Sequence, residues 1–461
     1  MNSKRSIPWL VVLCSIIALS AFLRLKGLTF QSYWDDELFS VAVSDPSRSL
    51  FEVIRLTVKD VHPPLFQILL WLWFKCFGFT ELTGRLFPAI CGILAIPVIY
   101  LLGNEAQGRE VGLIAALICS VNFYHLYYSQ EVRSYSLFFL LGSLSFLFCL
   151  KLMFAYEKRN LAFYIAFTVA LVYTHFFGIF AVVAQFIWLL AMLKRSPHLL
   201  KTGLIAGGLI LLMTSPLIPV VFKNASMDSF WIQRPPPDFI FQYFRQYFGS
   251  PMIAAFVAIF LFYGLIRRRS NEKEYAAGIF LVWVLTVYLM PYIRSMISTP
   301  MLTDRNTIVA LPAIFILCAF GLAKVKNRLL KIALTLTFLF VSLTHLFHEP
   351  MYYRVVTKPQ IREAALALIG RNPERDSVFS VPWVTRNFNV YFSLFNAPFR
   401  TRKIEDLIEA VKRGTAPKRF WIIDGQVGRL FATPMMDDKR FRVFNKTEFH
   451  GAAFVSMESV E

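Results

Sequence analysis

The sequence predicts an all-α polytopic membrane protein that carries a small soluble α/β domain at its C-terminal end. Of the 461 residues, 56% are apolar and 17% are charged, whereas soluble domains carry about 25% charged residues. The mean hydropathy is +0.54. Apolar stretches recur along residues 1–347, and residues 348–461 are more polar. We therefore expect a transmembrane domain over 1–347 and a soluble domain over 348–461.

The apolar stretches predict about eleven transmembrane helices. A helix needs about 20 apolar residues to cross the hydrocarbon core of a bilayer. No signal-peptidase site follows the first stretch, so we interpret it as an anchor. The two stretches around His175 are short and could form one broken pair. The predicted spans are residues 7–23, 85–103, 111–128, 135–153, 161–175, 177–193, 202–222, 252–267, 276–293, 304–323 and 329–347.

The distribution of Lys and Arg predicts the orientation of these helices, because short cytoplasmic loops are enriched in both residues. If the N-terminus is cytoplasmic, the opposite side has only isolated cations, and an odd number of spans places the C-terminal domain outside the cytoplasm. The loops at 24–84, 129–135, 174–178, 223–250 and 303–306 then share that outer side. The cytoplasmic loops would carry Arg109, Lys158, Arg159, Lys194, Arg195, Arg267, Arg268, Arg269, Lys273, Lys324, Lys326 and Arg328.

The loop at 24–84 is longer than most connections, and such loops are usually functional or disordered. Residues 38–56 alternate apolar and polar positions as an amphipathic helix does, and residues 66–78 are strongly apolar and aromatic. We expect both segments to be helices at the membrane interface, where Trp71 and Trp73 would lie naturally.

Three consecutive carboxylates, Asp35, Asp36 and Glu37, precede these interfacial segments. Their mutual repulsion should raise the pKa of at least one of them unless a cation or metal offsets it. Such a group suits a general base or a metal ligand. The alternative is a solvated acidic loop without a chemical role.

Five further polar residues lie at predicted helix ends on the same side. His62 precedes two prolines that fix the backbone, although it could be incidental to a helix start. Glu131 and Arg133 form a charged pair at a depth where charge is costly, either as an ion pair or in a cavity. Arg305 could hold an anion or extend to lipid headgroups. His175 is either a ligand or a turn histidine.

The C-terminal residues predict alternating helices and strands. IREAALALIG (361–370) and KIEDLIEAVKRG (403–414) have the pattern of helices, the second ending at Gly414. SVFSVPWV (377–384) and RFWIIDG (419–425) have the composition of strands. This alternation predicts a small α/β domain that could bind the acceptor or cover the active site. None of the six cysteines lies in this domain.

Several motifs together resemble the membrane glycosyltransferases of the GT-C superfamily, and more closely the branch of protein O-mannosyltransferases and lipid A aminoarabinose transferases. The resemblance covers about residues 1–345 and is strongest in 33–140. It is carried by the segments WDDELFS, HPPLFQILLWLWFKCFG, ELTGRLFPAICG, GREVGLIAAL, YYSQEVRSYSL, YTHFFG and TDRNTIVALPAIF.

This resemblance implies that a sugar carried on a polyprenyl phosphate is transferred to a lipid, protein or glycan acceptor on the non-cytoplasmic face. The Asp-Glu motif of the family maps onto Asp36 and Glu37, with Asp35 as an extra acid. In the aminoarabinose branch a basic residue precedes the Pro-Pro pair, and His62 stands there in this sequence. The expected location is the plasma membrane of a bacterium or an endomembrane.

The chemistry of such a transfer needs a base for the acceptor hydroxyl and positive charge near the departing phosphate. We predict an inverting reaction with Asp36 as the base, an effect of about 10²–10⁴-fold. Glu37 and Glu131 would orient the acceptor or sugar, or bind a divalent metal. The phosphate would be held by His62, Arg133 and Arg305. Tyr135 and His175 complete the predicted substrate-binding set.

Other classes of protein fit the sequence less well. A transporter would place charges near the membrane midplane and show internal repeats, whereas these charges gather at one side. A polysaccharide polymerase or ligase usually carries its functional loop late in the chain. A structural scaffold would not need the acidic cluster. Nucleic-acid binding does not follow from the net charge of +19, because the cations lie in short runs between apolar stretches.

Overall fold

The computed structural model describes residues 7–194, 197–226, 231–266, 272–348, 351–372, 375–425 and 438–460. Arg195 and Arg267 to Arg269, which contributed to the predicted orientation, lie outside the described residues. The chain forms two compact units. The first comprises Met1–Lys26, Leu50–Leu69 and Leu86–Tyr352, and the second comprises Gly27–Ser49, Leu70–Arg85 and Tyr353–Glu461.

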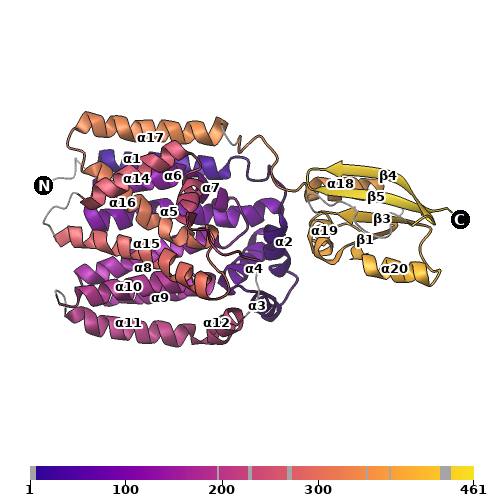
Figure 1. Ribbon diagram of the computed structural model, residues 1–461, viewed down its shortest axis with the longest axis horizontal. Helices are drawn as coiled ribbons and strands as arrows, with labels where there is room; N and C mark the ends of the chain where they lie inside the picture. Colours follow the sequence, from indigo (N-terminus) through magenta and orange to yellow (C-terminus); the bar gives the residue numbers. More distant parts are fainter. Residues whose placement is uncertain are drawn as a thin grey trace. The chain divides into compact units, whose positions relative to one another are not determined.

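The first unit is a bundle of helices, most of which lie side by side (Figure 1). Two helices, α4 (Leu65–Phe77) and α5 (Glu81–Gln107), contribute residues to both units. Two short 3-10 helices, η2 (Ser215–Leu217) and η3 (Arg305–Ala310), extend α12 and α16. The other helices are α1 (Ile7–Leu25), α3 (Leu50–Lys59), α6 (Arg109–Val121), α7 (Phe123–Ser129), α8 (Tyr135–Phe154), α9 (Lys158–Thr174), α10 (Gly178–Met192), α11 (His198–Thr214), α12 (Ile218–Ala225), α13 (Phe239–Phe248), α14 (Pro251–Ile266), α15 (Glu272–Ile297), α16 (Leu311–Ala323) and α17 (Arg328–His348).

Each predicted span contains a helix, but the predicted number of spans is not confirmed. Among the described residues, six helices are long and apolar enough to cross a membrane, or up to eight if each bent pair is one span. The bent pairs are α6 with α7, at 62°, and α13 with α14, at 109°. The helices α1, α4 and α10 are apolar but shorter. This content of apolar helices indicates an integral membrane protein.

The interior of the bundle is built around α16. This helix is the most buried of the six long apolar helices, whereas the α11–α12 segment and α17, at opposite edges in Figure 1, are the least buried. Beside α16, the rings of Phe146 in α8 and Trp283 in α15 stack with centroids 3.4 Å apart. α16 also approaches α14 so closely that a Cβ on Gly321 would clash with the carbonyl oxygen of Phe260.

The first loop departs from the prediction of one amphipathic helix over residues 38–56. The structure has two helices, α2 (Asp35–Val43) and α3, separated by a turn. In this turn the carboxylate of Asp45 accepts hydrogen bonds from the backbone and hydroxyl of Ser47, and Pro46 cannot donate a helical hydrogen bond. The helix expected over 66–78 is confirmed as α4.

The second unit contains a five-stranded sheet in the order β2-β1-β3-β5-β4. β1 pairs in parallel with β2 and β3, and β5 pairs in antiparallel with β3 and β4. The strands are β1 (Ser377–Ser380), β2 (Thr401–Lys403), β3 (Arg419–Asp424), β4 (Phe441–Phe449) and β5 (Ala452–Ser459). The C-terminal helices of this unit are α18 (Ile361–Arg371), α19 (Pro382–Leu394) and α20 (Ile404–Lys412).

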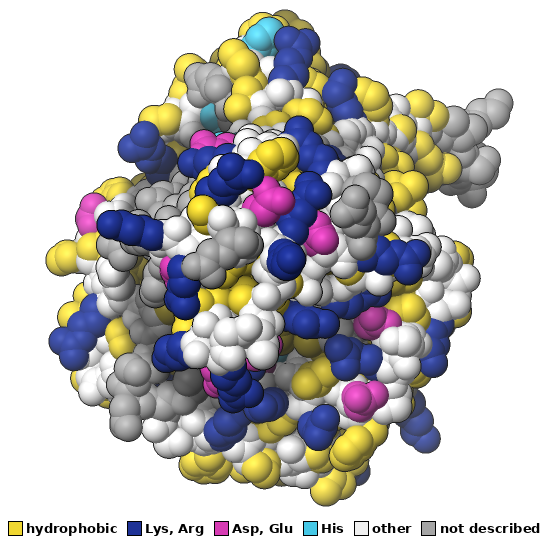
Figure 2. All heavy atoms as spheres, turned by 90° about the vertical axis from the view of Figure 1, so that its right-hand side faces the viewer, with side chains coloured by type: hydrophobic (Ala, Val, Ile, Leu, Met, Phe, Trp, Pro, Cys, Tyr) yellow, Lys and Arg dark blue, Asp and Glu magenta, His cyan; other side chains and the backbone are white. Residues whose placement is uncertain are grey.

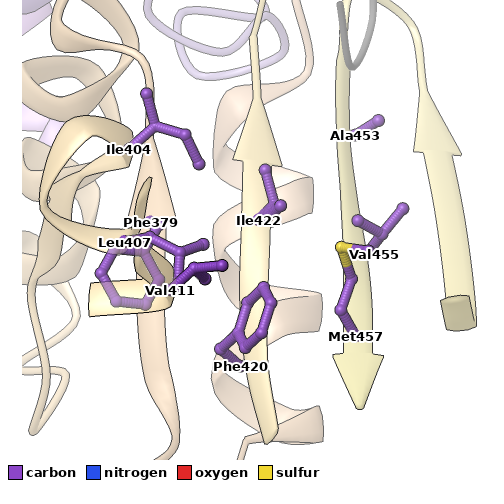
Figure 3. Close-up of a cluster of buried hydrophobic side chains, with 9 residues drawn as sticks. All are labelled: Phe379, Ile404, Leu407, Val411, Phe420, Ile422, Ala453, Val455 and Met457. Atoms are coloured by element: carbon purple, nitrogen blue, oxygen red, sulfur yellow. The ribbon is translucent and has the colours of Figure 1, made fainter. Parts of the chain in front are cut away.

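One face of the sheet packs on α20 through a cluster of buried apolar side chains (Figure 3). On the opposite face, the guanidinium of Arg371, at the end of α18, lies 5.6 Å from the ring centroid of Phe454. The sheet is therefore covered on both sides by helices. The cluster under α20 comprises Phe379, Ile404, Leu407, Val411, Phe420, Ile422, Ala453, Val455 and Met457.

The α/β prediction for the C-terminal residues is confirmed in part. Both predicted helices exist, and Gly414, two residues after the end of the second, adopts a positive φ of 70°. The predicted strand at 377–384 ends at Ser380, because Pro382 begins α19 in the first helical turn, where proline is favoured. The sequence did not predict β2 or the β4–β5 hairpin.

The surface of this sheet domain is rich in cations. Figure 2 shows more Lys and Arg than Asp and Glu side chains on the face that it presents. Such an excess of charge keeps a domain soluble. Exposed cations of this domain include Arg402, Lys403, Lys412, Arg413, Arg442 and Lys446.

Candidate active site

The predicted site residues fall into both units. His62, Arg133, His175 and Arg305 come together in the first unit and are called the cation cluster below. Glu131 and Tyr135 belong to the same unit, next to Arg133 in the chain. Asp35, Asp36 and Glu37 begin α2 in the second unit.

His62 lies between α3 and α4, and the residues before it are anchored. The ammonium of Lys223 donates to the carbonyl of Lys59 at 2.8 Å, and the amide of Asn224 donates to the carbonyl of Val61 at 3.2 Å. Both donors come from α12. The two prolines after His62 restrict the backbone on the other side, so the imidazole is held from both directions.

Arg133 and His62 form the centre of the cation cluster. The Nη2 atom of Arg133 lies 3.2 Å from Nε2 of His62. Because a guanidinium can only donate, Nε2 is the acceptor and the imidazole carries its proton on Nδ1. Asp60 lies 3.6 Å from the same Nε2 atom, beyond a good hydrogen-bond distance.

Arg305 reaches the cluster from the first residue of η3. Its neighbour Asp304 accepts a hydrogen bond from the hydroxyl of Tyr124 at 2.8 Å, which fixes the turn. The guanidinium carbon of Arg305 lies 4.9 Å from the ring centroid of Trp231, a cation–π distance. His175, between α9 and α10, hydrogen-bonds the side chain of Asn306, the residue after Arg305.

The two histidines of the cluster are neutral near pH 7. Burial is the largest cause that lowers the pKa of His62 well below 6.5, and the charges of Arg133, His175 and Arg305 lower it further. Burial, Arg133 and Arg305 also lower the pKa of His175 to about 3. The positive charge of the cluster therefore resides on the two arginines.

The turn between α7 and α8 carries Glu131 and Arg133, and Tyr135 is the first residue of α8. The backbone N–H of Arg133 donates to the carbonyl of Glu131 at 2.7 Å. The side chain of Gln130 donates to the backbone carbonyls of Arg24 and Lys26, at 2.8 and 2.9 Å. Glu131 is 1% exposed. Its carboxylate interacts electrostatically with the hydroxyl groups of Tyr127 and Tyr128.

In the second unit, Glu37 is fully buried and bound by two cations. Its carboxylate accepts two hydrogen bonds of 3.0 Å from Arg85 and one of 3.0 Å from the ammonium of Lys358. Arg85 also donates to backbone carbonyls of the first loop, including that of Ser32 at 2.9 Å. Glu37 thus joins α2, α5 and the segment before α18.

The two aspartates beside Glu37 are more accessible. Asp35 is exposed and accepts hydrogen bonds from Arg386 at 3.0 Å and from Asn387 at 2.8 Å. Asp36 is half-buried in the first turn of α2, where its carbonyl accepts from the hydroxyl of Ser40. The three acids, adjacent in sequence, therefore have three different environments.

The arrangement of His, Cys, Asp and Glu side chains among the described residues gives no support to a metal site. In the part of the chain that the structure describes, no group of three or more His, Cys, Asp or Glu side chains could together hold a metal ion. Both carboxylate oxygens of Glu37 already accept from cations.

The sequence did not single out Arg85, Lys358, Arg362 or Arg24, although each is held by several contacts. Arg85 and Arg24 are 1% and 0% exposed in helices that are otherwise apolar, and a buried charge in such a helix is itself a signal of function or structure. Lys358 and Arg362 have no comparable signal, since they lie in a polar stretch.

The geometry of the cation cluster suits an anion. Two guanidinium groups and a neutral imidazole provide donors for phosphate oxygens, and an arginine is able to bind two oxygens at once. None of the four residues that define the cluster is an acid, whereas glycoside hydrolysis requires two carboxylates that flank the bond. The cluster therefore suits the binding of a phosphate better than the hydrolysis of a glycoside.

Comparisons with known proteins give a match to one family. Residues 61–220 match the family described as dolichyl-phosphate-mannose-protein mannosyltransferase. A sequence comparison with curated proteins finds no match.

The fold is similar to that of several solved structures. One is ArnT from Cupriavidus metallidurans in the apo state, with a TM-score of 0.68, 13% identity and 98% of each chain covered. The same protein bound to undecaprenyl phosphate gives a TM-score of 0.66 at 12% identity, covering 97% of this chain and 98% of that chain. The archaeal oligosaccharyltransferase AglB from Archaeoglobus fulgidus gives 0.57 at 11% identity, covering 92% of this chain and 70% of that chain.

These findings confirm the resemblance that the motifs indicated: the chain has the fold of membrane glycosyltransferases of the GT-C superfamily.

Proposed function

We propose that the protein is an inverting glycosyltransferase that moves a sugar from a polyprenyl-phosphate donor to an acceptor on the non-cytoplasmic face of the membrane. The observation that carries this proposal is the cation cluster. In it, Arg133 donates a hydrogen bond to a neutral His62, and the charge of Arg305 lowers the pKa of the same imidazole. Such a cluster suits the phosphate of a lipid donor. The similarity to a structure of ArnT bound to undecaprenyl phosphate supports it.

The reaction is a single displacement. The oxygen of the acceptor hydroxyl forms a bond to the anomeric carbon, and the bond from that carbon to the phosphate oxygen breaks. The phosphate leaves with the electron pair and is stabilised by Arg133 and Arg305. The proton of the acceptor passes to the carboxylate of Asp36. We assign this role to Asp36 because Glu37, the other acid of the same motif, is fully buried and bound by two cations.

The remaining site residues have supporting roles in this proposal. Glu131 and Tyr135 flank Arg133 in the chain and would contact the sugar. His175 is neutral and hydrogen-bonds the side chain of Asn306, the residue after Arg305. It would therefore hold Arg305 at the phosphate. Glu37 orients α2 rather than touching the substrate, because its carboxylate is enclosed by Arg85 and Lys358. The acceptor is a lipid, a protein or a glycan, and the membrane is the plasma membrane of a bacterium.

The test uses the protein in lipid nanodiscs with a panel of radiolabelled polyprenyl-phosphate sugars and a crude membrane fraction as the acceptor. Release of polyprenyl phosphate and labelling of the fraction are measured together with donor binding. Asp36→Asn should lose transfer and keep donor binding, whereas Arg133→Ala should weaken donor binding. Asp406→Asn, an exposed position on α20, is the matched control and should behave as wild type.

Two outcomes would contradict the proposal. Transfer that survives Asp36→Asn would remove Asp36 from the role of base and move it to Asp35 or Glu37. Absence of both binding and turnover with every donor, for a protein that remains folded in nanodiscs, would remove the transferase function and favour transport.

A further inference from the structure

The C-terminal part of the second unit holds the stretch of chain that leads to the acidic triplet. Gln31 receives hydrogen bonds at its side-chain oxygen from the backbone N–H groups of Thr357 and Lys358, at 3.1 and 3.2 Å. Its side-chain amide donates to the carbonyl of Val355 at 2.7 Å. One glutamine thus fixes residues 355–358 against the first loop.

Four further residues of the first loop are bound to the C-terminal part of the unit. The backbone N–H of Tyr33 donates to the hydroxyl of Tyr391 in α19 at 2.6 Å, and the hydroxyl of Ser32 donates to Glu363 in α18 at 2.5 Å. Arg362 donates to the carbonyls of Thr29 and Phe30, at 2.8 and 3.2 Å. Residues 29–33 are therefore bound through both backbone and side-chain groups, which defines their path.

The same part of the chain neutralises both neighbours of Asp36. Lys358 donates to Glu37 at 3.0 Å, in a site where the side chain of the lysine is 9% exposed. Arg386 and Asn387 of α19 bind Asp35, and α19 packs on α2. Three adjacent carboxylates repel one another, so these contacts reduce the repulsion in the first turn of α2 and hold the turn that carries Asp36.

We infer that the C-terminal domain acts as the scaffold of the acidic motif, with Lys358 and Gln31 as positioning residues for Asp36. This inference rests on the proposed function, in which Asp36 is the base. It gives the domain a role in catalysis that requires neither acceptor binding nor movement over the site. It also explains why residues 27–49 form one compact unit with residues 353–461.

Two substitutions test the inference by different routes. Lys358→Met removes the ammonium from Glu37 and keeps the length of the side chain. Gln31→Ala removes the three hydrogen bonds to residues 355–358 without changing any charge. Lys358→Arg is the conservative variant that should restore the ion pair, and Lys412→Met, an exposed lysine of α20, is the matched control.

Both test variants should lower kcat by about ten- to a hundredfold, since a base displaced by about 1 Å can cost about a hundredfold in rate. The KM for the polyprenyl-phosphate donor should stay within about twofold, because the cation cluster is untouched. Hydrogen–deuterium exchange of residues 29–43 should increase in both variants. Lys358→Arg should retain most of kcat, and Lys412→Met should match wild type in every measurement.

The exchange measurement separates this inference from the proposed function. If the wild type transfers no sugar, the function fails, and exchange of residues 29–43 alone decides whether the domain anchors the motif. Unchanged exchange in both variants would overturn the inference. Increased exchange with a wild-type kcat would also overturn it, because the anchoring would then have no effect on the base.

Discussion

Arg133 donates a hydrogen bond from Nη2 to Nε2 of His62 over 3.2 Å. This geometry requires an imidazole whose Nε2 lone pair can accept. The neutral histidine links Arg133 to the turn before α4 without adding charge. An incoming phosphate would therefore meet two arginines held in place by neutral side chains.

Replacing Arg133 should weaken binding of the polyprenyl-phosphate donor. Loss of one charge-assisted hydrogen bond costs about 1.5–3 kcal/mol, which corresponds to about ten- to a hundredfold in affinity. Arg133→Ala should show this loss in a direct binding titration, and Arg133→Lys should recover only part of it because an ammonium lacks the planar fork. Arg402→Ala, at an exposed position of β2, is the control. Equal affinity in all four proteins would exclude Arg133 from the phosphate site.

The stability of the protein should fall as the pH decreases below about 6.5, in part because of His62. Its pKa is lowered in the folded protein, mainly by burial and then by Arg133, so the unfolded chain binds a proton that the folded chain does not. The contribution of His62 is complete above its unfolded pKa of about 6.5 and is lost as the pH falls toward the folded pKa. The loss is at most about 1.4 kcal/mol for each pH unit in this range.

Unfolding temperatures in nanodiscs between pH 7.5 and pH 5 check this prediction. His62→Gln keeps an acceptor for Arg133 and cannot titrate, so its unfolding temperature should fall less than that of wild type. His450→Gln, at an exposed position, should fall as much as wild type. If the unfolding temperature fell equally with pH in His62→Gln and in wild type, His62 would not titrate in this range.

The residues of the cation cluster could be predicted because each one departs from its surroundings. Arg133, Arg305 and His62 are polar side chains at the ends of apolar segments, where an isolated charge is costly. The partners of Glu37 are different. Lys358 is 321 residues away in sequence, and no local pattern records that pairing. Only the tertiary fold brings it to the carboxylate.

The same limit applies to the fold. Long apolar segments predicted the positions of the helices, since burial in a membrane requires them. The 62° bend between α6 and α7 was not predicted, because it is stabilised by a contact from α1 that is distant in sequence. The β4–β5 hairpin was missed because β4 is an edge strand whose residues are mostly exposed, so it lacks the apolar alternation that marks a half-buried strand.

Arg24 should stabilise the bend between α6 and α7. Its guanidinium is fully buried and donates to the carbonyls of Cys119 and Ser120, at 3.2 and 3.0 Å, where α6 ends. Each buried carbonyl left without a donor costs about 1–3 kcal/mol. Arg24→Met should therefore lower the unfolding temperature clearly, and Arg328→Met, at the exposed start of α17, should not. An unfolding temperature equal to wild type would show that another group satisfies these carbonyls.

Gly321 should be required for the contact between α14 and α16. A Cβ at this position would overlap the carbonyl oxygen of Phe260 and would lie 3.0 Å from the backbone nitrogen of Gly264. Backbone atoms cannot move aside as a flexible side chain can, so Gly321→Ala should push the helices apart, and membrane helices depend on such close packing.

Gly208 in α11 provides the matched control for this prediction. Among the described residues, a Cβ added to Gly208 would meet no atom of another element within 4 Å, and Gly208→Ala should be neutral or stabilising by about 0.5–1 kcal/mol. Thermal unfolding of the two variants in nanodiscs compares the same chemical change at a tight and an open position. If Gly321→Ala were as stable as Gly208→Ala, the contact between α14 and α16 would have to be looser than the structure shows.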